Sequence, residues 1–270
     1  MNKSQVLAQL QTELTAAIAA KATPAALRMH QALDHQRLDV SLLSDEHVKA
    51  VASFVCSNFA DEPLGVSCGR TPESDKDNGE QLAGFIELVG AMDRATSIVV
   101  TAGNAVVAVA LYDAHLNPST ESYDAVADPS RVFATVGGRI EASFVVMDHL
   151  ALPALTAKGV SLNKCLECAI GVTDSMYRGS LAGAAVGSSD AKVTKATLSI
   201  FQRLSLAANQ LAKLEGYAGI YTHSHDGSAA RRAECGFEVI HSIPYNQLPK
   251  NIAVTPVEGR NMMFMYQSLQ

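Results

Sequence analysis

The stretch Tyr221–Tyr245, YTHSHDGSAARRAECGFEVIHSIPY, decides how the fold of this chain is completed. Its first residues predict a short strand, and the polar turn after them leads to a helix that we expect to open at Ser228, a residue type that caps helices. Gly236-Phe237 breaks this helix, and a second strand follows. The stretch therefore predicts a strand–helix–strand unit that closes a sheet.

Upstream, residues 38–43 (LDVSLL) predict a short strand, and Ser44 or Asp45 is placed to cap a helix that follows it. Pro63 is expected to end that helix, because a proline disfavours the helical region for the residue before it. Residues 66–79 are expected to form a loop, and residues 80–95 repeat apolar positions at helical spacing.

Two strands at 97–103 and 105–114, joined at Gly103-Asn104, predict a hairpin. Residues 117–164 form an insertion before a strand at 168–172, and a long helical stretch then runs to Leu214. Residues 1–36 predict an N-terminal helical extension, with the main domain over 37–270. The element order indicates an α/β protein whose mixed sheet has helices on both sides.

Composition excludes several classes of protein. The chain has 270 residues, 48% of them hydrophobic, and a net charge of −6 without any basic run, which argues against nucleic acid as a partner. The N-terminus lacks a signal-peptide core and no segment approaches a bilayer span, so we expect a soluble cytoplasmic protein without a membrane partner. Five cysteines without framework spacing fit a reducing compartment. Core thiols are favoured over zinc ligands for Cys165 and Cys168.

The segment Tyr177–Ala185 (YRGSLAGAA) lies between a predicted strand and a predicted helix. Backbone amides at a helix start, left accessible by small residues, suit a pyrophosphate, and Arg178 adds a charged donor. The same glycines also suit tight packing of a helix on a sheet, and both interpretations stay open on this segment alone.

These pieces together resemble the GCN5-related N-acetyltransferase (GNAT) superfamily over roughly residues 37–270. The matching segments are CAIGVTDSMYRGSLAG, IYTHS and SAARRAECGFEVIHSIPY. Phe59–Leu64 (FADEPL) resembles the "DEPL" motif of insect-type arylalkylamine N-acetyltransferases, and the "SAxR…GF…PY" ending fits the same subgroup.

The resemblance implies acetyl-CoA as co-substrate and a set of site residues. It implies Glu62 as the general base, with Ser224 and Ser228 near the thioester. It implies that the pantetheine pairs with the 168–172 strand and that the pyrophosphate lies on the loop after it. The implied contacts are Ala169, Ile170, Gly171, Val172, Arg178, Gly179, Ser180, Leu181, Ala182 and Gly183. A positioned carboxylate suits this chemistry because an ammonium acceptor must lose a proton before it attacks.

The chain departs from the family pattern at two places. Counted from Arg178, the first glycine of the RxxGxG/A phosphate motif is replaced by Leu181. Arg232 stands where many GNAT enzymes carry a tyrosine acid, so protonation by tyrosine is not expected. His223 and His225 flank Ser224, and we interpret them as partly exposed pocket histidines, not metal ligands. Tyr112 and Tyr245 are candidates for lining an aromatic acceptor pocket, although packing explains them equally.

Three hypotheses remain at this point. The leading one is an acetyl-CoA-dependent N-acetyltransferase for a small primary amine, with no metal and with direct attack in a ternary complex. The second keeps the fold and changes the acceptor to a protein or peptide amine. The third is a non-catalytic CoA-binding module, which the broken phosphate motif supports. An oligomer is compatible with all three.

Overall fold

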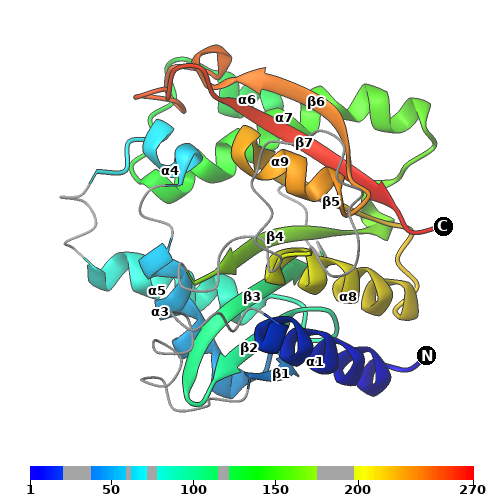
Figure 1. The fold of residues 1–270 in the computed structure, drawn as a ribbon. Coiled ribbons are helices and arrows are strands. Elements are labelled where there is room, and N and C mark those ends of the chain that lie inside the picture. The colour runs from blue at the N-terminus through cyan, green and yellow to red at the C-terminus, as the bar shows by residue number, and fades with distance from the viewer. Residues whose placement is uncertain (21–37, 59–61, 72–77, 115–121, 175–197) are drawn as a thin grey trace.

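A computed structural model of the chain contains one seven-stranded sheet (Figure 1). It describes residues 1–20, 38–58, 62–71, 78–114, 122–174 and 198–270. The strand order is β1-β2-β3-β4-β5-β7-β6. The strands are β1 (Leu38–Leu42), β2 (Ile98–Ala102), β3 (Ala105–Asp113), β4 (Cys165–Thr173), β5 (Gly219–His225), β6 (Glu238–Pro244) and β7 (Asn261–Ser268). The predicted mixed sheet is confirmed.

Every neighbouring pair of strands is antiparallel except β4 and β5. The connection between these two parallel strands contains α8 (Ile200–Leu214), as a crossover between parallel strands requires. The β2–β3 hairpin turns at Gly103-Asn104 as predicted, and Gly103 has a φ of 58° that suits a residue without a Cβ.

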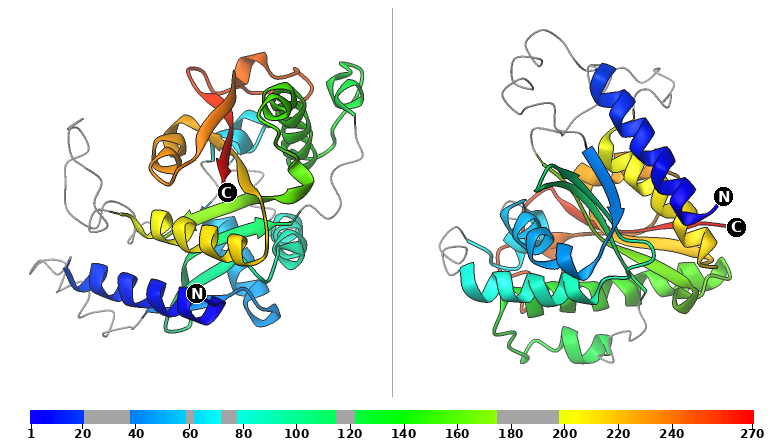
Figure 2. Two further views of the ribbon diagram at one scale, coloured as in Figure 1. Left: turned by 90° about the vertical axis from the view of Figure 1, so that its right-hand side faces the viewer. Right: turned by 90° about the horizontal axis from the view of Figure 1, so that it is seen from below.

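One face of the sheet is covered by α1 (Lys3–Ala20) and α8, which lie side by side in Figure 2. The inner face of α1 buries Val6, Leu10 and Leu14 in the same core as β1–β4. Arg203 of α8 pairs with Glu13 of α1 at 3.3 Å. The predicted N-terminal helix therefore packs as an integral layer of the fold, and the domain boundary after residue 36 stays a prediction.

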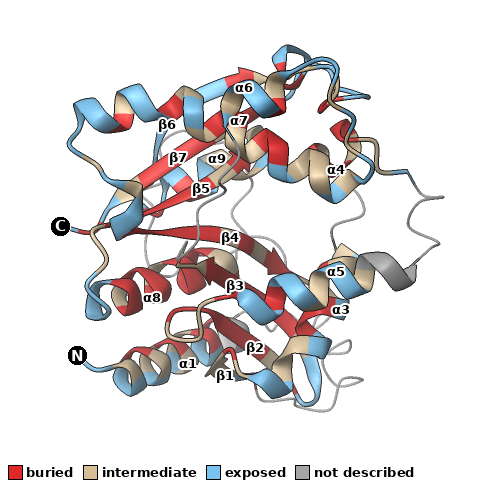
Figure 3. Cartoon of the chain, turned by 180° about the vertical axis from the view of Figure 1, so that it is seen from behind, coloured by how far each residue is buried: buried red, intermediate tan, exposed pale blue. Residues whose placement is uncertain are grey.

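The opposite face has two separate apolar clusters (Figure 3). Over β1–β4 lie α3 (Val48–Asn58) and α5 (Asn78–Ala91). Over β5–β7 lie α7 (Val136–Ala157), α4 (Pro63–Ser67) and α6 (Tyr123–Ala127). Short 3-10 turns occur at Asp45–His47, Leu162–Lys164 and Tyr245–Gln247. The helical covering of this face is thus divided along the line between β4 and β5.

The helix α7 corrects one expectation, because its length and apolar composition are sufficient to cross a membrane. Its inner residues Met147, Ala151 and Leu155 are buried, however, and they pack with β6 and β7 in one cluster. An apolar helix that covers a sheet needs the same composition as a membrane span, and the packing accounts for α7 as a covering helix.

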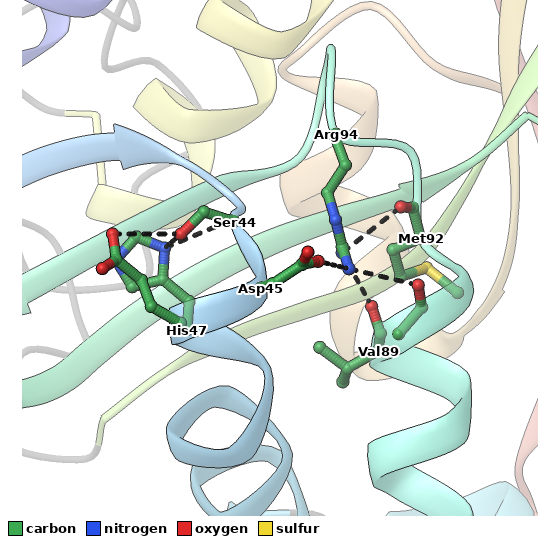
Figure 4. Close-up of polar contacts among 8 residues, drawn as sticks. Ser44, Asp45, His47, Val89, Met92 and Arg94 are labelled. Atoms are coloured by element: carbon green, nitrogen blue, oxygen red, sulfur yellow. Dashed lines mark hydrogen bonds and ion pairs between the residues drawn. The ribbon is translucent and has the colours of Figure 1, made fainter.

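Arg94, which follows α5, joins the helical segments that cover the first half of the sheet (Figure 4). Its guanidinium donates to the carbonyls of Val89 at 3.1 Å and Gly90 at 3.2 Å, and it pairs with Asp45 at 3.0 Å. A cation at a helix C-terminus satisfies carbonyls that have no partner inside the helix. Arg94 therefore fixes the end of α5 against the start of the α3 segment.

Two predicted helix boundaries are wrong. Pro63 is the first residue of α4, a short helix where the sequence predicted a loop from residue 66, whereas the described part of α3 reaches Asn58. Glu62, directly before the proline, is extended as predicted. Proline suits this first position because its missing N–H would have no partner there. The last helix, α9 (Asp226–Ala233), is capped by His225 and not by Ser228, which lies inside its first turn.

Candidate functional site

The sheet opens between β4 and β5, and we call this opening the splay. The two strands pair only at Cys165–Gly219, Leu166–Ile220 and Glu167–Tyr221. Beyond these pairs β4 stays with β3 as far as Thr173, while β5 stays with β7 as far as His225. The strands diverge because each follows a different neighbour.

A β-bulge explains the divergence. Leu111 pairs with Ile170 and Tyr112 pairs with Cys168, so Ala169 is the extra residue on β4. A bulge bends its strand and increases the local twist. The stretch from Ala169 to Val172 consequently turns toward the splay an edge that no strand of the described chain pairs with. Four of the predicted CoA contacts lie on this edge, whereas Arg178, Gly179, Ser180, Leu181, Ala182 and Gly183 lie outside the described residues.

Ser224 and Ser228 form a hydrogen-bonded pair on the β5 side of the splay. Their hydroxyl oxygens lie 2.6 Å apart, and the Ser228 hydroxyl also donates to the carbonyl of His225 at 3.1 Å. Ser224 is buried at the end of β5, and Ser228 comes from the first turn of α9. The serine pair can therefore pass a proton between strand and helix.

Glu62 is the N-cap of α4, and its Oε2 accepts from the backbone N–H of Gly65 at 2.7 Å. The sequence placed this residue at the end of a helix, and the structure corrects that position. The Glu62 carboxylate is close enough to Tyr245 and Cys68 for its charge to add to burial in raising the pKa of both groups. The cap fixes the direction of the carboxylate before any substrate binds.

His225 connects Glu62 to the serine pair. Burial lowers the pKa of His225, and the Glu62 charge opposes this effect. Its Nδ1 accepts from the N–H of Gly227 at 3.0 Å, so the neutral ring carries its proton on Nε2. The Glu62 charge therefore reaches His225, which adjoins the serine pair, although Glu62 is distant from these residues in the sequence.

The route of the chain explains this convergence. The helices α3 and α5 belong to the apolar cluster over β1–β4, whereas Leu64 and Cys68 of α4 belong to the cluster over β5–β7. The chain must therefore cross from one half of this face to the other after α3 and return before α5. Glu62 lies on the crossing.

His223 was interpreted as partly exposed, and this is wrong. Its side chain is 4% exposed and lies between two carboxylates, with Nε2 at 2.8 Å from Asp148 of α7 and Nδ1 at 2.9 Å from Glu167 of β4. The ring stacks on Phe144 with centroids 4.4 Å apart. Burial lowers the pKa of His223, but the two carboxylates outweigh it and raise the pKa to about 10.

We call His223, Asp148, Glu167 and Phe144 the His223 cluster. It links β4, β5 and α7 at the place where the pairing of β4 with β5 ends. Since both ring nitrogens face carboxylates, neither has a free lone pair for a metal ion. Across the residues that the structure describes, no set of three or more His, Cys, Asp and Glu side chains is arranged to hold a metal ion.

On the other face of β4, Arg232 of α9 is 6% exposed. Its Nη1 donates to the sulfur of Cys168 at 3.3 Å, and its guanidinium lies over the rings of Phe201 at 5.1 Å and Phe237 at 5.9 Å. Cys168 and Cys165 are both buried in β4. The residue that replaces the expected tyrosine is thus a buried cation beside the splay.

The tyrosines considered for an acceptor pocket separate in the structure. Tyr112 is fully buried in the core beneath α1 and α8, and burial raises its pKa. Tyr245 is buried in the other cluster, where the Glu62 charge adds to burial in raising the pKa of its phenol. Of the two tyrosines, only Tyr245 is affected by Glu62.

Comparison with known proteins identifies the fold. No family model matches the chain, and no curated protein sequence matches it. Solved structures do match: mosquito arylalkylamine N-acetyltransferase like 5b, with a TM-score of 0.58 and 15% identity, and arylalkylamine N-acetyltransferase 2 from Aedes aegypti, with 0.57 and 16%. A polyamine N-acetyltransferase from Drosophila melanogaster matches with 0.54 and 15%. Each comparison covers 86% of this chain and 99% of the other.

The chain has the GNAT fold. At this level of identity the match establishes the fold alone, so the roles of individual residues rest on the geometry. The sequence singled out Glu62 and the two serines, and the structure joins the two serines by a hydrogen bond. The sequence also named His223 and Arg232, but not the two carboxylates that hold His223 or the burial of Arg232.

Proposed function

We propose that this protein is an acetyl-CoA-dependent N-acetyltransferase that acetylates a small primary amine by direct attack in a ternary complex. The observation that carries the proposal is the position of Glu62: it is fixed as the N-cap of α4, and its charge reaches His225, whose backbone carbonyl accepts a hydrogen bond from Ser228. A fixed base and a pair of hydroxyls near a strand edge that no strand of the described chain pairs with suit transfer of an acyl group.

The open β4 edge fits an extended pantetheine. Main-chain groups of Ala169–Val172 that no strand of the described chain pairs with can bond its amides, as an added strand would. The same groups can polarise the thioester carbonyl. Arg178 and residues 179–183 stay our prediction for the pyrophosphate.

Glu62 and the serine pair carry out different proton transfers. Glu62 takes a proton from the ammonium group of the acceptor, directly or through water. The freed amine forms a bond to the thioester carbonyl carbon, and the carbon–sulfur bond breaks with its electron pair moving to sulfur. The serine pair gives a proton to that sulfur, and the second N–H proton of the amine, lost as the amide forms, restores the hydroxyl that gave it; the relay runs from Ser224 to Ser228 or in the reverse direction.

A small cationic acceptor is the class that we favour. The solved structures of the same fold include enzymes named for arylalkylamines, agmatine and polyamines. The net charge of −6 is compatible with attracting a cation. We also assign the protein to the cytoplasm, because all five of its cysteines are free thiols.

Release of CoA thiol with an amine panel tests the proposal. The panel contains an arylalkylamine, agmatine, spermidine and a peptide with a free amino terminus, each with acetyl-CoA. We expect thiol release that requires a small amine. Thiol release with the peptide alone would replace the acceptor class, and no release with any member would refute the catalytic function.

The variant Glu62→Gln tests the base. We expect kcat/KM at pH 7 to fall about 10²–10⁴-fold, the usual contribution of a general base, with acetyl-CoA affinity unchanged. The matched control is Glu141→Gln on the exposed side of α7, which should leave the rate unchanged. An unchanged rate in Glu62→Gln would remove Glu62 from the mechanism even if the enzyme class is right.

A further inference from the structure

Arg232 is a buried cation for which the described part of the chain supplies no counter-charge. Within the described ranges its one hydrogen bond goes to the sulfur of Cys168, and its Nε has no hydrogen-bond partner there. Glu234, two residues further along, is hydrogen-bonded to Gln202 instead. Among the residues described, no carboxylate lies within ion-pair distance of Arg232.

Burial of the Arg232 charge destabilises the folded state, so the needs of folding do not explain this arrangement. An arginine stays protonated at any ordinary pH, so it cannot avoid the cost of burial by losing its proton. Burying a charge without an opposite charge strongly disfavours the folded state, and two aromatic faces compensate only in part. A hydrophobic residue of similar volume would fill the same space more favourably.

The position of the guanidinium indicates where an anion would meet it. Arg232 and Ser228 are four residues apart on α9, so they project from the same side of this helix. Ser228 is hydrogen-bonded to Ser224 at the end of β5. Cys168, which accepts from Arg232, is the first residue of β4 after the last pair with β5. Arg232 therefore lies at the closed end of the splay, one helical turn beyond the serine pair.

We propose that Arg232 is a catalytic residue that binds the sulfur of CoA as a thiolate. This inference rests on the proposed function. When the carbon–sulfur bond of the thioester breaks, its electron pair moves to sulfur, and the guanidinium stabilises that negative charge by a charge-assisted hydrogen bond. The serine pair then supplies the proton that converts the thiolate to the thiol. The existing bond to the Cys168 sulfur shows that sulfur is an acceptor this guanidinium can reach.

Paired titrations with CoA and desulfo-CoA, which carries hydrogen in place of the thiol, test the inference. Isothermal titration calorimetry at pH 6.5 and pH 9 gives the ratio of the two affinities for the wild-type protein. We expect CoA to bind at least tenfold more tightly than desulfo-CoA at pH 9 and the ratio to shrink at pH 6.5, because a bound thiolate must form from a thiol. Equal affinities at both pH values would overturn the role of Arg232.

Two variants separate charge from packing. Arg232→Gln should abolish the pH-dependent preference for CoA while it keeps the affinity for desulfo-CoA, and Arg232→Lys should retain part of the preference. A preference that survives in Arg232→Gln would overturn the proposal. If wild-type protein binds neither ligand, the proposed function fails together with this inference, whereas binding of both without preference removes only the inference.

Thermal unfolding of the ligand-free proteins gives a further readout that needs no activity. Because no carboxylate of the described residues pairs with Arg232, we expect Arg232→Met to unfold at the same temperature as wild type or higher. A marked decrease would show that the guanidinium is a structural contact, and it would contradict the assignment of a ligand-binding role.

Discussion

The His223 cluster should make the stability of the fold depend on pH in a predictable direction. The perturbation is His223→Gln, which keeps a polar side chain but removes the positive charge between Asp148 and Glu167. The folded state raises the pKa of His223 from 6.5 to about 10. A raised pKa means that the folded protein holds this proton more tightly than the unfolded chain does.

The size of the effect follows from this difference. A rise from 6.5 to about 10 corresponds to about 5 kcal/mol, at about 1.4 kcal/mol for each pH unit. The Asp148 side chain is 35% exposed, so solvent screens part of the attraction, and we expect about 2–3 kcal/mol. This stability is fully present below pH 6.5 and is lost as pH rises toward 10.

Urea unfolding followed by circular dichroism at pH 6 and pH 10 measures the effect. We expect His223→Gln to destabilise the protein by about 3–4 kcal/mol at pH 6, as removal of one member of a buried ion pair does, and by about 1 kcal/mol at pH 10. His241→Gln on β6 is the control, since no carboxylate pairs with this histidine among the described residues, and it should show no such pH dependence. A destabilisation by His223→Gln that is equal at both pH values would refute the charged state assigned to His223.

Three further predictions concern the serine pair, Gly171 on the splay edge of β4, and the contacts of Arg94. Ser228→Ala should lower kcat by about tenfold with acetyl-CoA affinity unchanged, because one proton relay is lost; steady-state kinetics with a saturating amine measures it. Gly171→Ala would place a Cβ in steric clash with the edge of the Phe201 ring, so we expect a loss of about 1–3 kcal/mol in thermal unfolding that a smaller residue at position 201 restores. Arg94→Met should cost about 1–2 kcal/mol through the lost caps on α5, whereas Asp45→Asn should change stability by less than about 0.5 kcal/mol because that carboxylate is 96% exposed; urea unfolding of both variants distinguishes capping from the ion pair.

Much of the sheet was predictable from local pattern. Two apolar runs rich in valine on either side of the Gly103-Asn104 turn specify the β2–β3 hairpin, and Gly236 has a φ of 97° at the predicted break before β6. These features depend on a few neighbouring residues: side chains alternate along a strand, and only some residues adopt a positive φ. Such signals are readable without any tertiary contact.

Local signals were ambiguous where two rules apply to one residue. Pro63 fits both the end of a helix and the first position of a new one, and the choice depends on where α3 ends against its core. Ser228 fits an N-cap, but His225 takes that place because β5 continues to residue 225 in its pairing with β7. The structural positions predicted for both residues were therefore wrong.

The sequence by itself, through its resemblance to known motifs, led to Glu62, Ser224 and Ser228 as candidate site residues. Only the tertiary structure decided which groups face one another. His223 of β5 has its partners on β4 and α7 because these two elements pack against the end of the β4–β5 pairing. Arg232 is buried without a counter-charge among the described residues because α9 packs it against Cys168 of β4. Charge pairing and burial depend on contacts between segments that are distant in the chain, which local sequence patterns do not specify. The splay also depends on tertiary structure, because it follows a bulge at Ala169 in the pairing of β3 with β4.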